Sequence, residues 1–249
     1  MKFSEKAQET YQTWFKGQED ELAKTDPVFW QRFLNFTFGE VENDVKLDDQ
    51  TRLIAILATL LGCQGIDEFK IMLNAALNVG VKTVVIKEII YQATAYLGMG
   101  RVRPFFKVAN EVFEKRGITL PVEVETTADE NTRMKRGEEM QVEIFGEGMH
   151  NFANSGPEDS RHINKWLVGN CFGDYYTDKG LTTAQREMIT FCYLFAQGGA
   201  EPQVIAHAKG NFNVGNDKDF LIAIVSQNVP FIGYPRALNA INCIRKAAE

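Results

Sequence analysis

The chain carries one sequence pattern twice, in the same order and nearly in register. The two copies keep their spacing with a single-residue slip, in the loop near Gly65 and Gly199. The matched positions are Gly39-Glu40 with Gly173-Asp174, Leu47 with Leu181, Arg52 with Arg186, Asn78-Val79-Gly80 with Asn213-Val214-Gly215, Gly98 with Gly233, and Arg101 with Arg236. Such a duplication implies two copies of one folding unit, so residues that differ between the copies are informative.

Helical periodicity dominates both copies, and strand-like alternation is scarce. Segments 48–62 and 182–197 are apolar almost all round, which predicts two buried central helices. Further helices are predicted at about 4–24, 67–80, 82–98, 103–117, 129–147, 201–214, 217–232 and 235–248. We therefore predict an all-α protein of two tandem helical bundles, related by an approximate two-fold axis that packs the central helices together. Repeat 1 would span residues 1–120 and repeat 2 residues 121–249, with an acidic linker over 118–130.

Composition excludes several classes of protein. The chain has 249 residues, which suits two domains, and a net charge of −6, which argues against a nucleic-acid partner. No apolar run of about 18 residues predicts a membrane span, and the N-terminus lacks the apolar core of a signal peptide. The four cysteines show no C-x-x-C spacing and indicate reduced thiols, so we expect a cytoplasmic protein. No metal or nucleotide motif appears, and we expect neither metal nor cofactor.

A histidine marks one difference between the copies. His207 stands where the first copy has Met72, and it shares a helical stripe with Gln203 and Asn211. One interpretation is a satisfied core or interface histidine. The other is a proton-transfer residue, because imidazole titrates near neutrality.

A carboxylate recurs at one place in both copies. Asp174 ends an aromatic-rich helix, and Glu40 occupies the equivalent position. Asp174 can be a structural cap or a salt-bridge partner of Arg186, or it can orient His207 and tune its pKa. Nearby aromatic residues can wall a pocket for a flat ring or belong to the core: Phe172, Tyr175, Tyr176, Phe231 and Tyr234.

Four motifs in the second half occur in a recognisable order: "CFGDYYTDKGLTTAQRE", His207, the "NVG" turn and "YPRA". With these motifs the second half resembles the carboxymuconolactone decarboxylase family, and the first half resembles a degenerate copy of the same domain. The resemblance implies an all-α fold of the alkylhydroperoxidase D-like type and a cofactor-free decarboxylation of a small carboxylated lactone or related organic acid. It makes His207 the general acid and Asp174 its orienter or a second acid. The expected substrate-binding residues are Gln203, Tyr175, Phe231, Tyr234 and Arg186.

The resemblance also implies assembly. Single-domain relatives form rings of six, so a tandem chain should form a trimer, with a dimer as the second expectation.

Two other functions stay open at this stage. One is a peroxide-linked, thiol-dependent antioxidant activity using Cys63 or Cys192, although the C-x-x-C positions of that branch are Ala200 and Gln203 here. The other is a degenerate, non-catalytic oligomer that binds a small molecule. The first copy lacks the histidine, and the second lacks the family glutamate four residues before it, which survives only as Glu68; these two losses favour the non-catalytic interpretation.

Overall fold

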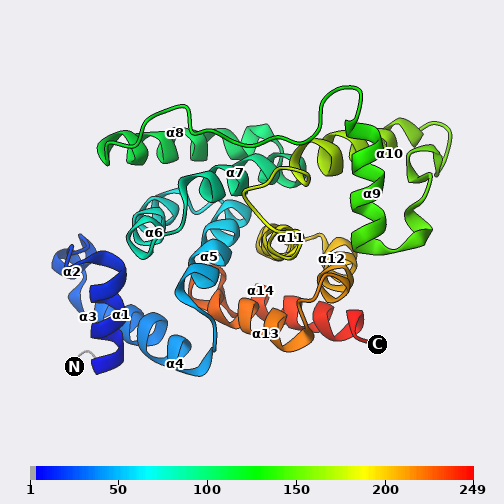
Figure 1. Cartoon of the computed structure of the whole chain (residues 1–249). Coiled ribbons are helices and arrows are strands. Elements are labelled where there is room, and N and C mark those ends of the chain that lie inside the picture. The colour runs from blue at the N-terminus through cyan, green and yellow to red at the C-terminus, as the bar shows by residue number, and fades with distance from the viewer. Residues whose placement is uncertain (1–3) are drawn as a thin grey trace.

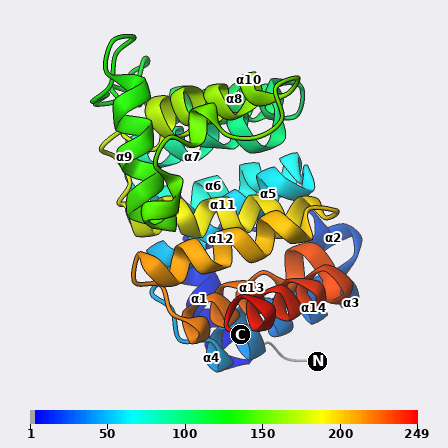
Figure 2. The same ribbon diagram turned by 90° about the vertical axis from the view of Figure 1, so that its right-hand side faces the viewer.

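The protein is all-helical over residues 4–249, the range that the computed structural model describes, so residues 1–3 of the predicted first repeat lie outside it (Figures 1 and 2). The first repeat contains α1 (Glu5–Phe15), α2 (Leu22–Thr25), α3 (Pro27–Leu34), the π-helix η1 (Asn35–Val41), α4 (Glu42–Asp44), α5 (Asp49–Cys63), α6 (Ile66–Val79), α7 (Thr83–Leu97) and α8 (Met99–Lys115). The second contains α9 (Arg133–Phe145), the short 3₁₀ turns η2 (Glu147–Met149) and η3 (Phe152–Asn154), α10 (Arg161–Trp166), the π-helix η4 (Leu167–Tyr175), α11 (Thr183–Gln197), α12 (Glu201–Asn213), α13 (Lys218–Gln227) and α14 (Val229–Ala247).

The central helices begin where their capping residues predict. The Asp48 side chain accepts a hydrogen bond from the Thr51 backbone N–H at 2.9 Å and starts α5. Thr182 and Gln185 cap each other reciprocally and start α11. Two boundary predictions were wrong. The helix expected over 4–24 breaks at Lys16, which is in the left-handed region (φ 52°), and the helix expected over 217–232 ends at Gln227. Helix α14 is kinked at Gly233 (φ 76°), so its long part begins near the predicted residue 235.

Reciprocal hydrogen bonds show that the two repeats are related by an approximate two-fold axis. The Arg186 guanidinium on α11 donates to the Gln92 side chain on α7 at 2.9 Å. Arg52 on α5 donates to the Gln227 side chain on α13. Gln92 and Gln227 are equivalent, since each lies six residues before its matched glycine. A contact that recurs with its partners exchanged is self-complementary, as a two-fold axis requires.

The outer helices repeat this relation. Asn78 donates to the Trp14 carbonyl at 2.8 Å, and Asn213 donates to the Ile144 carbonyl at 2.8 Å. Helix α1 is therefore the counterpart of α9, and Phe15 is the counterpart of Phe145.

One apolar core runs through both repeats, because the buried side chains of α5, α6 and α7 are continuous with those of α11 and α12. Helices α5 and α11 cross near the centre of the molecule (Figures 1 and 2). The division at 120/121 stays a prediction, and the linker over 118–130 is non-helical, as predicted.

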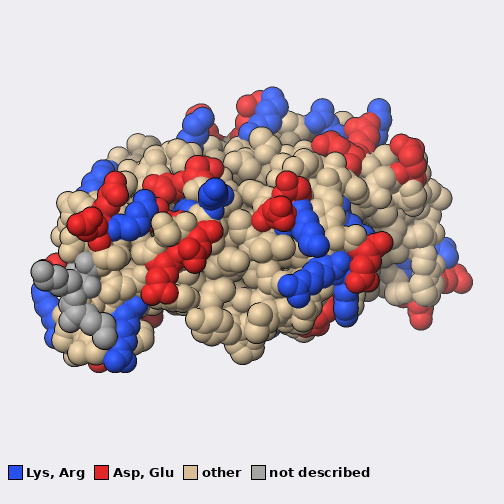
Figure 3. All heavy atoms as spheres, turned by 90° about the horizontal axis from the view of Figure 1, so that it is seen from below, with Lys and Arg blue, Asp and Glu red and all other residues tan. Residues whose placement is uncertain are grey.

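Acidic and basic side chains are interspersed on the face seen in Figure 3, with broad areas that carry neither. Within residues 4–249, no helix combines the length and the apolar character needed to cross a membrane.

The close approach of α5 and α11 depends on Gly62. A Cβ atom there would lie 2.7 Å from the Ala196 Cβ and 2.7 Å from the Tyr193 carbonyl oxygen. We expect Gly62→Ala to lower the free energy of unfolding by about 1–3 kcal/mol, as overpacking does. Gly100→Ala is the matched control, since nothing lies within 4 Å of its Cβ position. Urea unfolding of both variants tests this; equal stabilities would contradict the role of Gly62.

Candidate active site between the repeats

His207 is held by a buried carboxylate that the sequence did not single out. His207 lies on α12, and its Nδ1 is 2.9 Å from Oε2 of Glu187, which follows Arg186 on α11. Glu187 is 0% exposed and His207 is 8% exposed. The other ring nitrogen, Nε2, has no hydrogen-bond partner among residues 4–249, and it is not one of their buried unpaired atoms. The imidazole is therefore anchored on one side and open on the other.

The second oxygen of Glu187 is also occupied. The Tyr176 hydroxyl donates to Oε1 at 2.9 Å and lies 2.6 Å from the Thr190 hydroxyl. The Tyr96 hydroxyl is 2.8 Å from that of Tyr176, so a chain of hydroxyl groups ends on the carboxylate. Because each carboxylate oxygen of Glu187 has a hydrogen-bond partner, the orientation of Glu187 is fixed, and so is that of the His207 ring.

Part of this site comes from the first repeat. Glu88, Gln92 and Tyr96 lie four residues apart on α7 and therefore share one face of the helix. Glu88 pairs with Arg186, and Gln92 donates to the Thr190 hydroxyl at 2.8 Å. The site is complete only where α7 of one repeat meets α11 of the other.

Aromatic rings enclose the imidazole. The Tyr96 and Phe145 rings stand edge-on to His207, with centroid distances of 5.5 and 5.4 Å. One helical turn before Phe145, Gln141 is fully buried, and its amide nitrogen and oxygen have no partner. The comparison of the two copies predicts a pocket beside His207, but none of the hollows described below is lined by it.

Burial keeps the surrounding hydroxyl and thiol groups protonated. Burial, with the charge of Glu187 adding to it, raises the pKa of Tyr96 and Tyr176 well above 10. Burial also raises the pKa of the Cys171 thiol to about 12. These groups therefore act as neutral hydrogen-bond donors at neutral pH, and Cys171 is no thiolate nucleophile.

The carboxylate of Asp174 does not bond to His207. It accepts from Arg133 at 2.6 Å and from Asn170 at 3.0 Å, at a half-exposed position of η4. The orienting role expected for Asp174 is filled by Glu187, and the expected bridge to Arg186 is absent because Arg186 pairs with Glu88.

The structure does not gather the five expected substrate-binding residues around His207. Arg186 is buried, with Glu88, Gln92 and the Asp178 carbonyl as partners. Phe231 packs against Phe33, and Tyr234 is 63% exposed with its ring near Phe36, so both lie with aromatic residues of the first repeat. Tyr175 is half-buried, and Gln203 is exposed one turn before His207.

One signal could have found Glu187. It is an acid in an otherwise apolar central helix, and the equivalent residue after Arg52 is Leu53. No spacing rule could have found Tyr96, because it lies in the other repeat. Within residues 4–249, no three His, Cys, Asp or Glu side chains gather closely enough to hold a metal ion.

Comparisons with known proteins agree with this architecture. Residues 27–111 and 162–246 each match the carboxymuconolactone decarboxylase family. A 4-carboxymuconolactone decarboxylase from Acinetobacter baylyi is 33% identical over 90 residues, 36% of this chain and 67% of the relative. The fold is similar to a crystal structure described as a gamma-carboxymuconolactone decarboxylase subunit from Burkholderia xenovorans. That similarity has a TM-score of 0.57 and 16% identity, over 98% of this chain and 97% of the other.

The buried thiols should be inert in the folded protein. Burial raises the pKa values of Cys171 and Cys192 to about 12, and all four cysteines are free. We expect a maleimide at pH 7.5 to leave Cys171 and Cys192 unmodified in the native state and to modify all four after unfolding in guanidinium. Mass spectrometry of digested samples identifies the labelled positions. Rapid native labelling of Cys171 or Cys192 would contradict this.

Proposed function

The chain belongs to the carboxymuconolactone decarboxylase family, and we propose that it is a cofactor-free carboxy-lyase with His207 as its general acid. The proposed substrate is a small carboxylated lactone of the γ-carboxymuconolactone type or a related organic acid. The observation that carries the proposal is the imidazole bonded through Nδ1 to buried Glu187 while Nε2 stays without a partner.

The reaction needs a proton at a defined place. When the carboxylate leaves as CO₂, the electrons of the broken C–C bond enter a conjugated dienolate, which must then be protonated on carbon. The protonated ring donates from Nε2 and keeps the Nδ1 proton toward Glu187. The bond to Glu187 fixes the ring so that Nε2 is the nitrogen left to meet the substrate. The exposed edge of the ring then returns a proton from solvent.

The hydroxyl groups serve as positioning residues. Tyr176 and Thr190 hold Glu187, and Tyr96 holds Tyr176, so the angle of the imidazole is set from both repeats. Gln203 and Tyr175 remain the proposed substrate contacts, because neither has a role in the core.

The two other functions have less support. A thiol-dependent activity needs a low-pKa cysteine, whereas burial raises the pKa of Cys63, Cys171 and Cys192. A non-catalytic binder does not explain why His207 and Glu187 occur as a bonded pair in one repeat, while Met72 and Leu53 replace both in the other.

Substitution of the pair tests the proposal. We expect His207→Asn and His207→Met to lower kcat by about 10²–10⁴, since each removes the proton donor. Glu187→Gln should cost at least about tenfold, because an amide holds the ring less firmly in the orientation and tautomer that leave Nε2 free. Asp174→Asn is the matched control carboxylate and should retain most of the activity. CO₂ release from a carboxymuconolactone substrate is the readout, and circular dichroism checks the fold. Unimpaired turnover by folded His207→Met would overturn the assignment.

We also propose that the chain assembles into a closed homo-oligomer, a trimer first and a dimer second. Large apolar side chains are exposed on several helices: Phe29, Ile163, Trp166, Tyr234 and Leu238. Exposed apolar surface of this kind is typical of interfaces between proteins. Light scattering at micromolar concentration should give a mass above that of one chain. A monomer would contradict this expectation.

A further inference from the structure

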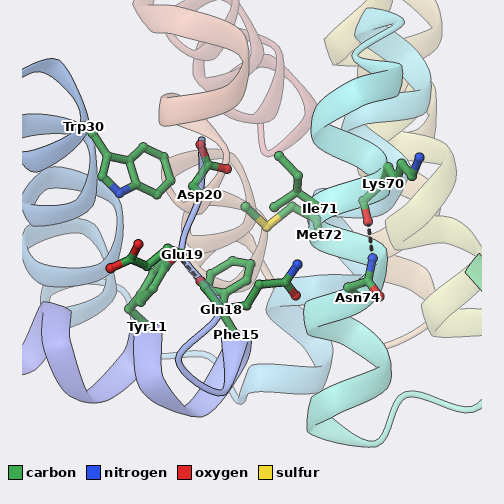
Figure 4. A pocket seen from close by; sticks show the side chains of 10 residues that line it. All are labelled: Tyr11, Phe15, Gln18, Glu19, Asp20, Trp30, Lys70, Ile71, Met72 and Asn74. Atoms are coloured by element: carbon green, nitrogen blue, oxygen red, sulfur yellow. Dashed lines mark hydrogen bonds between the residues drawn. The ribbon is translucent and has the colours of Figure 1, made fainter. Parts of the chain in front are cut away.

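A hollow in the first repeat lies where the second repeat carries His207. Its volume is about 180 Å³, and it is lined by Tyr11, Phe15, Gln18, Glu19, Asp20, Trp30, Lys70, Ile71, Met72 and Asn74 (Figure 4). Met72 is the counterpart of His207, and Phe15 is the counterpart of Phe145. The duplicated fold therefore offers two equivalent places, one filled by an imidazole and its aromatic neighbours and one left hollow.

The walls of this hollow suit a flat ring. In Figure 4 the Trp30 indole stands on one side, Met72 and Ile71 on the other, and the Phe15 and Tyr11 rings below. Aromatic and thioether side chains favour contact with aromatic ligands. An apolar cavity of about 150 Å³ is known to accept benzene, so about 180 Å³ accommodates one aromatic ring with a short substituent.

Trp30 and Tyr11 form one corner of the hollow. Trp30 is only 8% exposed, and its ring stands edge-on to that of Tyr11 with a centroid distance of 6.2 Å. The Tyr11 hydroxyl donates to the Gln18 carbonyl at 2.7 Å and holds the loop with Glu19 and Asp20 against α1. In Figure 4 the Asp20 carboxylate is drawn between Trp30 and Met72.

The charge around the hollow is negative. Glu19 has Lys24 as an ion-pair partner at 3.9 Å, but both side chains are about three-quarters exposed, so the pair is weak. Lys70 turns its ammonium group away from the space between Trp30 and Met72 in Figure 4. On the far rim, the Arg116 guanidinium bonds to Asn74 and Asn78. One turn before Met72, burial and the charge of Asp20 raise the pKa of Glu68 to about 7, as expected where no cation compensates the carboxylates.

A second hollow adjoins the first. It measures about 610 Å³, shares Tyr11, Glu19 and Trp30 with it, and continues along α1 past Glu5 and Glu9. The two hollows therefore share part of their walls, and carboxylates line both.

We propose that the hollow beside Met72 is a binding site for a small aromatic amine, with the ring between Trp30 and Met72 and the ammonium group facing Asp20 and Glu19. The ring gains contact with the indole and the thioether, and the ammonium group is attracted to both carboxylates. The same carboxylates repel the carboxylated substrate proposed for His207. The two equivalent places have therefore diverged in the charge of the molecule they take.

Titration calorimetry with a pair of ligands of similar shape tests the site. We expect 2-phenylethylammonium to bind once per chain with a Kd of roughly 1 mM or lower, and phenylacetate to bind at least about tenfold more weakly. Quenching of tryptophan fluorescence by 2-phenylethylammonium should give the same Kd, since Trp30 lines the site.

Variants distinguish the site from surface attraction and from the His207 site. The double variant Glu19→Gln, Asp20→Asn should weaken binding at least about fivefold. The matched control Glu158→Gln, Asp159→Asn removes an equal charge from an exposed loop of the second repeat and should bind like the wild type. His207→Met should also bind normally, so this test is independent of the proposed decarboxylation. Equal affinity for phenylacetate, no saturable binding, an equal loss in the control variant, or loss of binding in His207→Met would each overturn the proposal.

Discussion

Two buried arginines, one on each central helix, connect the halves of this protein. Arg52 and Arg186 are almost fully inaccessible, and a buried guanidinium is costly unless most of its donors are hydrogen-bonded. The Nε of Arg186 has no partner, but each arginine donates to a glutamine of the opposite repeat, so each repeat supplies a partner for the arginine of the other. Arg186 also has Glu88, whereas Arg52 relies on Gln227 and on backbone carbonyls such as those of Leu47 and Val45. This exchange, together with the close approach at Gly62, sets how α5 and α11 lie across each other.

The candidate active site follows from that arrangement. Glu187 is the next residue after Arg186, so the contacts that hold the arginine also position the carboxylate. The stripe on α7 continues from Glu88 and Gln92 to Tyr96, which reaches the hydroxyl of Tyr176. The proposed proton donor and the carboxylate that holds it therefore lie on an interface that the fold already requires. Because the same contacts hold the fold and the site, the polar network runs without a break from the ion pair of Glu88 and Arg186 to His207.

The asymmetry between the repeats is coordinated. Around Met72, the equivalents of Glu187 and Tyr96 are Leu53 and Phe231, so the imidazole, the carboxylate and the hydroxyl are all absent together. Phe231 belongs to the second half of the sequence but stands at the place in the first repeat that Tyr96 holds in the second. Its contact with Phe33 instead of His207 is the direct consequence of the two-fold exchange. The hollow beside Met72 is then what remains when the polar network is replaced by apolar side chains and an acidic loop is kept beside them.

The sequence by itself determined the fold class, the duplication and the central helices. Those features depend on local periodicity, capping at Asp48 and Thr182, and matched residues, all of which can be read along the chain. It also identified His207, because the comparison of copies showed that the fold does not need an imidazole there. The sequence did not predict the break of the first helix at Lys16, because a lysine in the left-handed region cannot be told from a helical lysine by residue type.

Only the tertiary structure decided which carboxylate meets the histidine. Asp174 and Glu187 are both acids near matched motifs, but the first faces Arg133 and the second faces His207, a difference set by how α9 and α12 pack on their neighbours. Likewise, Tyr96 enters the site because α7 lies against α11 and η4 of the second repeat. Phe231 and Tyr234 lie outside it because their rings contact Phe33 and Phe36 of the first repeat. Residue spacing along a chain determines which residues share a face of a helix, but long-range packing determines what that face contacts. Here, residues of each repeat contact the other repeat, as Tyr96 and Phe231 do.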